Sequence, residues 1–336
     1  MSVAERIKER AGRPTGVEAR RGLLSVREFG IFCAALSIFL LLWILTPEFR
    51  SSSNLLNVVR QVSLMGIIAT GMTFLFIAGE LDLSVGTMYG FLAMIMAELS
   101  IANGWSPWLA APVTVLLGSV FGWFNGFMVT RFKIPAFIIT LGMLSVFRGA
   151  TLVLSNGYPI SGLQAPAFRQ LTGGYIGGVL PVQILWLAVV MLVAGFALAR
   201  TRFGYHVYAT GGNATAAANV GIRTNRIKIA CFVLTGALAG LAAALLVGWL
   251  RGASPLTGQG FELDVIAAVI IGGTNLFGGS GSVLGTFLGA VIMGMIANGL
   301  VLLGVSAFWE PVAKGAIIVA AVLLDILIRK RRSNGA

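Results

Sequence analysis

Apolar residues run in stretches of about 20 residues along nearly the whole chain, and this feature constrains the fold most. A stretch of this length lets a helix cross the ~30 Å hydrocarbon core of a bilayer. Only 11% of the 336 residues are charged and 57% are hydrophobic, whereas a soluble domain carries about 25% charged residues. A span that is lined by lipid must satisfy its own backbone hydrogen bonds. The sequence therefore predicts an all-α polytopic membrane protein.

We expect about ten transmembrane helices and three regions. Residues 1–28 form a basic cytosolic tail, residues 29–330 the transmembrane domain, and residues 331–336 a second tail. The eighth stretch is short and bounded by glycines, so we expect a broken or partly re-entrant helix there. The ten stretches lie at about 29–47, 55–78, 83–102, 107–129, 134–154, 181–199, 228–250, 264–277, 282–304 and 310–328.

The basic residues indicate the orientation of the chain. With ten spans both termini lie on one side, and most of the 24 lysines and arginines then fall in the tails and in the loops of that side. The loops of the opposite side hold only Arg50, Arg169 and Arg251. Cytoplasmic loops carry the excess of Lys and Arg, so the distribution predicts N-in/C-in. It also accounts for the net charge of +12 without a nucleic-acid partner.

Several landmarks occur twice in the same order, five spans apart. Glu80-Leu81-Asp82 precedes the third predicted span, and Glu262-Leu263-Asp264 precedes the eighth. Asn125-Gly126 and Asn298-Gly299 lie in the fourth and ninth. Because five is odd, the second copy must be inverted relative to the first. We therefore predict two inverted five-helix repeats, at 29–154 and 181–328, an arrangement typical of transporters that open alternately to the two sides.

Polar residues beside these apolar stretches are candidates for a translocation path, because charge in a membrane needs a partner or water. One interpretation places the helix breaks against the path; the alternative is that the acidic and hydroxyl side chains only cap helix N-termini. Both stay open at this point. The candidates are Glu80, Asp82, Ser84, Asn125, Glu262, Asp264, Thr274, Asn275 and Asn298.

The loop 200–228 is the largest cytosolic feature after the first tail. Asn213 can cap a short alanine-rich helix, Ala214–Val220, and Gly221 suits the position after its end. A helix this short is unstable alone, so we expect it to dock on a cytosolic protein or on the membrane surface. No lysine follows a glycine-rich phosphate loop, and the sequence offers no catalytic set or metal-ligand cluster.

Three segments together resemble the permease subunits of ribose-type sugar ABC importers, over about residues 30–328. They are Gly79–Gly86, the loop from Thr201 through Gly211-Gly212-Asn213 to Ile222, and Glu262–Gly289. The resemblance implies a permease in the inner membrane that passes a monosaccharide or related carbohydrate. It implies partners as well: ABC ATPase domains that hydrolyse the ATP, a periplasmic sugar-binding protein, and a second permease copy or sister permease. No cofactor would be bound by this chain.

The resemblance also implies that the loop 200–228 is the coupling loop that seats in the ATPase. The matching positions are Gly204, Gly212, Asn213, Ala216, Ala217 and Gly221. The chain departs from the family pattern at Tyr205 and Ala214, where basic and acidic residues are common, and at Glu80, where a second glycine is usual.

A different class of transporter stays open at this point. Glu80, Asp82, Glu262 and Asp264 would bind protons or cations in an ion-coupled secondary transporter. A membrane enzyme is disfavoured, because the sequence lacks a recognisable catalytic set.

Overall fold

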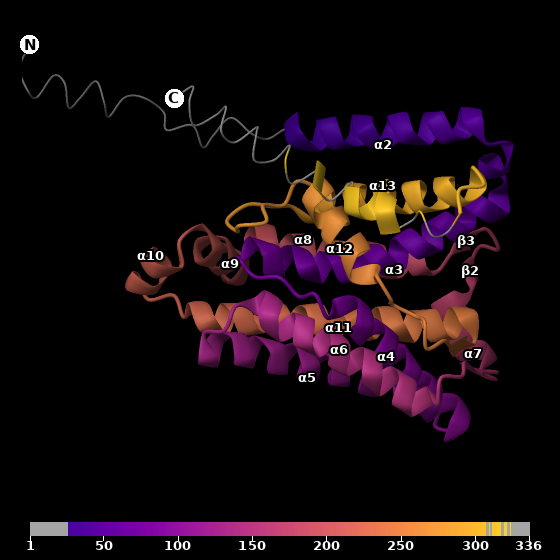
Figure 1. The fold of residues 1–336 in the computed structure, drawn as a ribbon, viewed down its shortest axis with the longest axis horizontal. Coiled ribbons are helices and arrows are strands. Elements are labelled where there is room, and N and C mark those ends of the chain that lie inside the picture. Colours follow the sequence, from indigo (N-terminus) through magenta and orange to yellow (C-terminus); the bar gives the residue numbers. More distant parts are fainter. Residues whose placement is uncertain (1–25, 307–308, 310, 317–318, 321–322, 324–336) are drawn as a thin grey trace, which may run out of the picture.

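The computed structural model describes residues 26–306, 309, 311–316, 319–320 and 323, and these residues form a long bundle of helices (Figure 1). Helix α10 lies at one end of the bundle and helix α7 at the other, and we name the two ends after them. The longer helices are α2 (Val26–Leu45), α3 (Ser52–Ile77), α4 (Val85–Ala97), α5 (Pro107–Phe132), α6 (Ala136–Ser155), α8 (Gln183–Arg200), α11 (Thr224–Leu250) and α13 (Val283–Leu302).

Eight helices in the described residues are long and apolar enough to cross a membrane, with α4 extended to Ala102 by the π-helical turn η2 (Glu98–Ala102). They correspond to eight of the predicted spans. Helix α2 begins at Val26, and its membrane-length apolar segment is Glu28–Leu45, close to the predicted first span. The predicted span at 264–277 is α12 (Phe261–Ile271), which is too short to cross alone. The tenth, 310–328, lies largely outside the described residues, although 311–316 are helical.

The remaining elements are short. At the α7 end, β1 (Ile160–Ser161) pairs antiparallel with β4 (Gly252–Ala253), and β2 (Tyr175–Ile176) with β3 (Leu180–Pro181). The other short elements are η1 (Pro47–Arg50), α7 (Pro166–Gly173), α9 (Arg202–Gly212) and α10 (Ala214–Asn219). The described part of the chain is thus all-α apart from these two-residue strands, as predicted.

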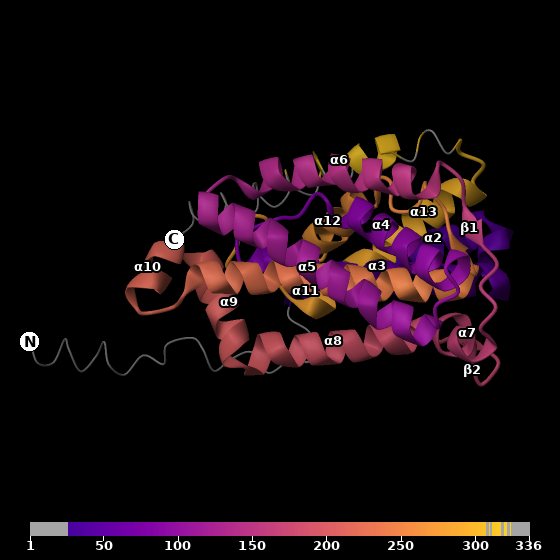
Figure 2. The same ribbon diagram turned by 90° about the horizontal axis from the view of Figure 1, so that it is seen from below.

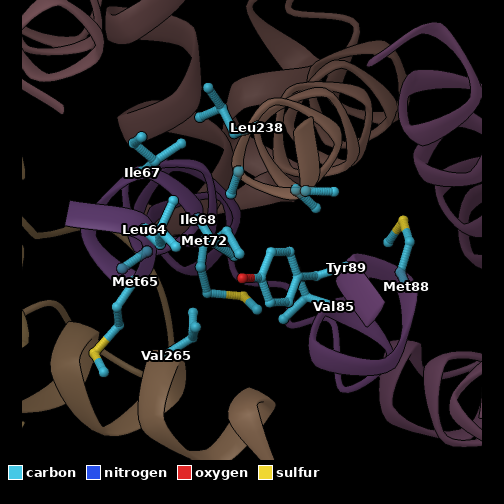
Figure 3. Close-up of a cluster of buried hydrophobic side chains, with 14 of the residues drawn as sticks. Leu64, Met65, Ile67, Ile68, Met72, Val85, Met88, Tyr89, Leu238 and Val265 are labelled. Atoms are coloured by element: carbon cyan, nitrogen blue, oxygen red, sulfur yellow. The ribbon is translucent and has the colours of Figure 1, made fainter. Parts of the chain in front are cut away.

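Helix α3 lies in the centre of the bundle and is buried along most of its length, whereas α2, α6 and α8 expose most of their apolar side chains. In a membrane protein such exposed apolar faces are suited to contact with lipid. Figure 3 shows the core, where side chains of α3, α4, α11 and α12 meet around Tyr89. The bundle is therefore a buried set of helices, α3, α4, α11 and α13, with more exposed helices around it (Figure 2).

Glycines allow α5 and α11 to pack backbone to backbone. A methyl group on Gly236 of α11 would lie 2.0 Å from the carbonyl oxygen of Gly118, and one on Gly122 would lie 2.2 Å from that of Phe232. Membrane helices have no hydrophobic drive to associate within lipid, so close packing through small residues supplies much of the attraction. These contacts explain why apolar spans with little amphipathic character associate in a defined way.

Helices α4 and α12 both begin inside the bundle and run toward opposite ends. After α3 ends at the α10 end, residues 78–84 return into the bundle and α4 begins at Val85. After α11 ends at the α7 end, residues 254–260 return from the other side and α12 begins at Phe261. The two starts meet, because a methyl on Gly86 would lie 2.6 Å from the backbone nitrogen of Glu262.

Replacing Gly236 with alanine should destabilise the bundle by about 1–3 kcal/mol, because the methyl group has no space against the α5 backbone. The measurement is thermal unfolding of the detergent-solubilised chain. Gly195→Ala in α8 is the matched control, since nothing lies within 4 Å of its added methyl group. Equal melting temperatures for the two variants would contradict the close α5–α11 packing.

Candidate functional site

The candidate site is the region where the starts of α4 and α12 meet. Beyond Gly86, a methyl on Gly90 would lie 2.0 Å from the carbonyl oxygen of Thr257. The rings of Tyr89 and Phe261 stack with centroids 5.4 Å apart. Two helix N-termini, each with unsatisfied amides and a partial positive charge, therefore lie side by side in the interior.

Asp82, Ser84 and Asn125 come together in a fully buried network just before α4. Ser84 donates to Asp82 Oδ1 from its backbone nitrogen at 2.8 Å and from its hydroxyl at 2.6 Å. The Asn125 amide donates to Asp82 Oδ2 at 3.2 Å and to the Ser84 hydroxyl at 3.0 Å. All three side chains are completely buried. The network thus supplies hydrogen bonds to the Asp82 carboxyl group in the non-helical segment before α4. In this conformation the carboxyl group has no contact with solvent.

The other three acidic candidates lie in different surroundings. Glu80 forms an ion pair with Lys228 at 2.5 Å, and Asp264 forms one with Lys314 at 2.7 Å. Glu262 lies against the first turn of α4, with Oε2 about 2.4 Å from where a methyl on Gly86 would be. That oxygen is buried and has no hydrogen-bond partner among the described residues.

The capping alternative holds only in part: Asp82 accepts a hydrogen bond from the backbone amide of Ser84 at the start of α4, and Glu262 and Asp264 lie in the first turn of α12. Ser84 is the N-cap residue of α4 but makes no side-chain cap bond. The N-cap of α12 is Gly260. Glu262-Leu263-Asp264 therefore lies inside α12 rather than before it, unlike Glu80-Leu81-Asp82, which precedes α4. The two tripeptides are alike in sequence but differ in local structure.

Of the remaining candidates, Asn298 and Asn275 have side-chain hydrogen-bond partners, whereas the buried Thr274 hydroxyl has none among the described residues. The Asn298 and Asn54 amides bond reciprocally, at 2.7 and 3.0 Å, so Asn298 does not repeat the contacts of Asn125. Asn275 bonds within its own loop, donating to the Gly278 carbonyl oxygen at 2.6 Å and accepting from Phe277 at 2.8 Å. Thr274 is buried near Gly281. Whether any of the nine lines a path stays a prediction.

The predicted short helix in the loop 200–228 is present as α10, one residue shorter than expected. Asn213 caps it, accepting from the Ala216 backbone at 2.9 Å. At its other end Gly221 has φ +91°, and Ile222 donates to the Ala217 carbonyl oxygen at 3.0 Å, as in a Schellman motif. Except for Ala217, the α10 side chains are exposed, and α10 projects from its end of the bundle (Figure 1).

Two glycines of the coupling loop differ in how closely they are packed. A methyl on Gly204 would lie 2.2 Å from the Leu198 carbonyl oxygen, so Gly204 permits the tight turn from α8 into α9. Nothing lies within 4 Å of such a methyl on Gly212.

Sequence reasoning missed a contact that we name the glycine junction, formed by Ile77, Gly211, Gly278 and Gly279. Gly279 donates its amide to the Ile77 carbonyl oxygen at 2.9 Å, and a methyl on Gly211 would lie 1.7 Å from the same oxygen. The junction therefore joins the end of α3, the end of α9 and the loop that follows α12. The glycine doublets at 211–212 and 278–279 are visible in the sequence, but nothing there shows that they meet.

Tyr208 of α9 strengthens the same connection. Its hydroxyl donates to the Gly281 carbonyl oxygen at 2.8 Å. Burial, and then the nearby Glu28, raise the pKa of Tyr208 above its ordinary value, so the hydroxyl stays protonated and keeps its donor role. Helix α9 is thus held to the 272–282 loop both by backbone packing and by a side-chain hydrogen bond.

Arg148 is a further residue that the list of candidates omitted. It lies in the middle of α6 and donates from Nη1 to the carbonyl oxygen of Pro255, in the segment that enters the bundle before α12. No group of three His, Cys, Asp or Glu residues among the described residues could hold a metal ion.

The comparisons with known proteins identify the class of this chain. Residues 54–322 match the family described as "Branched-chain amino acid transport system / permease component". This match covers most of the chain and agrees with the helices long enough to span a membrane. The chain therefore belongs to this family of transport permease components and is a multi-pass membrane protein.

Individual relatives are similar over nearly their whole length. The chain is 41% identical over 301 residues to the ribose import permease protein RbsC of Bacillus subtilis (strain 168), covering 89% of this chain and 93% of that protein. It is 38% identical to the ribose import permease protein RbsC of Haemophilus influenzae, with 88% and 91% covered. The xylose transport system permease protein XylH of Escherichia coli (strain K12) is 33% identical, with 92% and 94% covered. No solved structure gives a significant match.

Replacing Asn125 with leucine should destabilise the chain by about 1–3 kcal/mol, because a buried carboxyl group loses a donor. The measurement is thermal unfolding in detergent, with Gln164→Ala, an exposed amide, as the control that stays within about 0.5 kcal/mol of the parent. If the network acts as a unit, the double variant Asp82→Asn/Asn125→Leu loses less than the sum of the single losses. If the two single losses of unfolding free energy add up to that of the double variant, the Asp82–Asn125 hydrogen bond makes no net contribution to stability.

Proposed function

We propose that this chain is the membrane-spanning permease subunit of an ABC importer that carries a monosaccharide or related carbohydrate across the inner membrane. The similarity to ribose and xylose permeases over about nine-tenths of the chain carries this proposal. The family description names branched-chain amino acids, but each of these relatives is named for a sugar. An exposed, doubly capped α10 anchored to the bundle supports a role as the docking point for a separate ATPase.

The distribution of charge supports placing the α10 end in the cytosol. Helices α5 and α8 end there, α11 begins there, and the basic residues near these helix ends outnumber those at the α7 end. At the α10 end these are Arg131, Lys133, Arg200, Arg202, Arg223, Arg226 and Lys228. With this orientation both tails lie in the cytosol, α10 faces the ATPase, and the α7 end faces a periplasmic sugar-binding protein.

The arrangement of α4 and α12 supports the predicted inverted repeat. Each follows a long buried helix, each is preceded by a segment that returns into the bundle, and the two run in opposite directions. Broken helices of this kind, with N-termini that meet near the membrane midplane, are typical of alternating-access transporters. The contacts of Asn125 and Asn298 differ, so the proposed symmetry concerns the course of the backbone rather than these side chains.

We infer that the glycine junction transmits motion from α10 to both broken helices. It contacts the end of α3, from which residues 78–84 lead to α4, and the loop that follows α12. A shift of α9 must therefore move both the segment that leads to α4 and the loop that follows α12. Otherwise it must break backbone contacts that leave no space for a methyl group. ATP binding by the partner ATPase would favour one conformation of the complex, because the affinity for ATP differs between the two conformations. Hydrolysis would then remove this preference.

Three of the four acidic candidates give little support to an ion-coupled transporter; the fourth, Glu262, has a buried oxygen without a hydrogen-bond partner among the described residues. Glu80 and Asp264 contact lysines, and Asp82 accepts three hydrogen bonds. Such groups are already compensated in this state, and the relatives above are permeases of sugar import or transport systems. The importer proposal also includes a second permease copy or a sister permease beside this chain.

Reconstitution tests the proposed function directly. Vesicles that hold this chain with its ABC ATPase and its sugar-binding protein should accumulate ribose or a related sugar when ATP is supplied. Omission of either partner should reduce accumulation to background, because the chain carries no nucleotide site of its own. Gradient-driven accumulation by the chain alone would contradict the proposal and favour the ion-coupled class.

Replacing Gly211 with alanine should lower sugar uptake by the complex roughly tenfold, a change of the size seen along coupling networks, while ATP hydrolysis continues. Measuring both rates in one preparation gives the sugar moved per ATP. Tyr208→Phe should lower the same ratio to a smaller extent, and Gly195→Ala is the control. A Gly211→Ala complex that assembles and transports with the parental ratio would exclude the junction from coupling.

A further inference from the structure

A polar cavity of about 290 Å³ lies at the α10 end, outside the meeting point of α4 and α12. It is formed where α5 ends, α6 begins and α11 begins. Polar and charged side chains from these segments contribute to its lining. The lining residues are Glu80, Val129, Thr130, Lys133, Ile134, Pro135, Ala136, Asn225 and Lys228.

The charges that line this cavity do not balance. Lys133 and Lys228 contribute two positive charges and Glu80 contributes one negative charge. The Glu80 carboxylate is already engaged with the Lys228 ammonium at 2.5 Å. Lys133 follows α5 in the left-handed conformation, with φ +56°, and its side chain is exposed. One positive charge is therefore left over for a ligand with a single negative charge.

The helices around the cavity add to the positive potential. Pro135 and Arg223, the N-cap residues of α6 and α11, make no side-chain cap bond. Ala136 and Asn225, in the first turns of these helices, line the cavity. Amides that are unsatisfied in the first turn of a helix bind phosphate groups. In α11 the Thr224 and Arg226 amides already donate to backbone oxygens, so the Asn225 amide and the first turn of α6 remain. The Asn225 side-chain amide supplies a further donor for phosphate oxygens, whereas the Thr130 hydroxyl already donates to the Gly126 carbonyl oxygen.

We propose that this cavity binds the phosphate group of an acidic phospholipid. A phosphodiester carries one negative charge, which equals the excess of the lining. The cavity lies beside the ends of membrane-length helices, at the level that the proposed orientation gives to cytosolic headgroups. Basic pockets between membrane helices on that side bind anionic headgroups. Because Glu80 competes with the phosphate for Lys228, the bound lipid also loosens the segment that leads to α4.

The full chain in a neutral detergent tests this proposal without any transport measurement. Native mass spectrometry compares the retention of phosphatidylglycerol and phosphatidylcholine with matched acyl chains. The parent should retain the acidic lipid preferentially. Lys133→Gln should weaken retention about fivefold, the order of magnitude that one lysine near a membrane surface supplies. Lys133→Arg should preserve it, and Glu80→Gln should strengthen it, because the competitor for Lys228 is removed.

Arg131→Gln is the matched control, since it removes the same charge from the last turn of α5 but does not line the cavity. Equal retention of the two lipids, or equal losses in Lys133→Gln and Arg131→Gln, would overturn the proposal in favour of general surface charge. Displacement of the lipid by excess inorganic phosphate, with no preference among acyl lipids, would assign the cavity to a free anion. Displacement by ribose would assign it to the sugar path.

Discussion

The structure depends on how polar groups are satisfied where the chain breaks inside an apolar bundle. A buried backbone or carboxyl group without a partner costs free energy, and lipid offers no substitute for water. Residues 78–84 and 254–260 both interrupt the helical pattern, and each is surrounded by compensating contacts. Ser84 and Asn125 donate to Asp82, and Arg148 donates to the carbonyl oxygen of Pro255. These contacts let α4 and α12 begin in the interior.

Glycines supply the second condition, because broken helices can meet only where backbones approach closely. Gly86 and Gly90 bring α4 against residues 257–262, and Gly118 and Gly236 bring α5 against α11. At the α10 end, Gly211 and Gly279 hold α9 on the last carbonyl of α3. The closely packed interior and the exposed α10 are therefore parts of one mechanical unit. The proposed coupling to a separate ATPase requires such a connection between α10 and the interior.

Local structure could be predicted where the cause lies within a few neighbouring residues. The Asn213 cap and the Gly221 turn are examples, because both depend on side chains and backbone of the same loop. For the acidic tripeptides the same reasoning left capping open as an alternative, and local contacts explain only part of their surroundings. Asp82 bonds across to Asn125, and Glu262 lies against α4, so distant segments decide what these carboxylates contact. The pairing of Lys314 with Asp264 and of Asn54 with Asn298 is non-local in the same way.

The sequence by itself determined the class of the protein and most of its helices, since length and hydropathy decide which segments can cross a bilayer. It also determined α10, whose caps lie at its own two ends. Only the tertiary structure decided that the start of α12 meets that of α4, and that two glycine doublets join at Ile77. The physical reason is that these features come from close approach between segments far apart in the chain. The glycines in a sequence show where a close backbone contact is possible, but the packing of the whole bundle decides which glycines make such a contact.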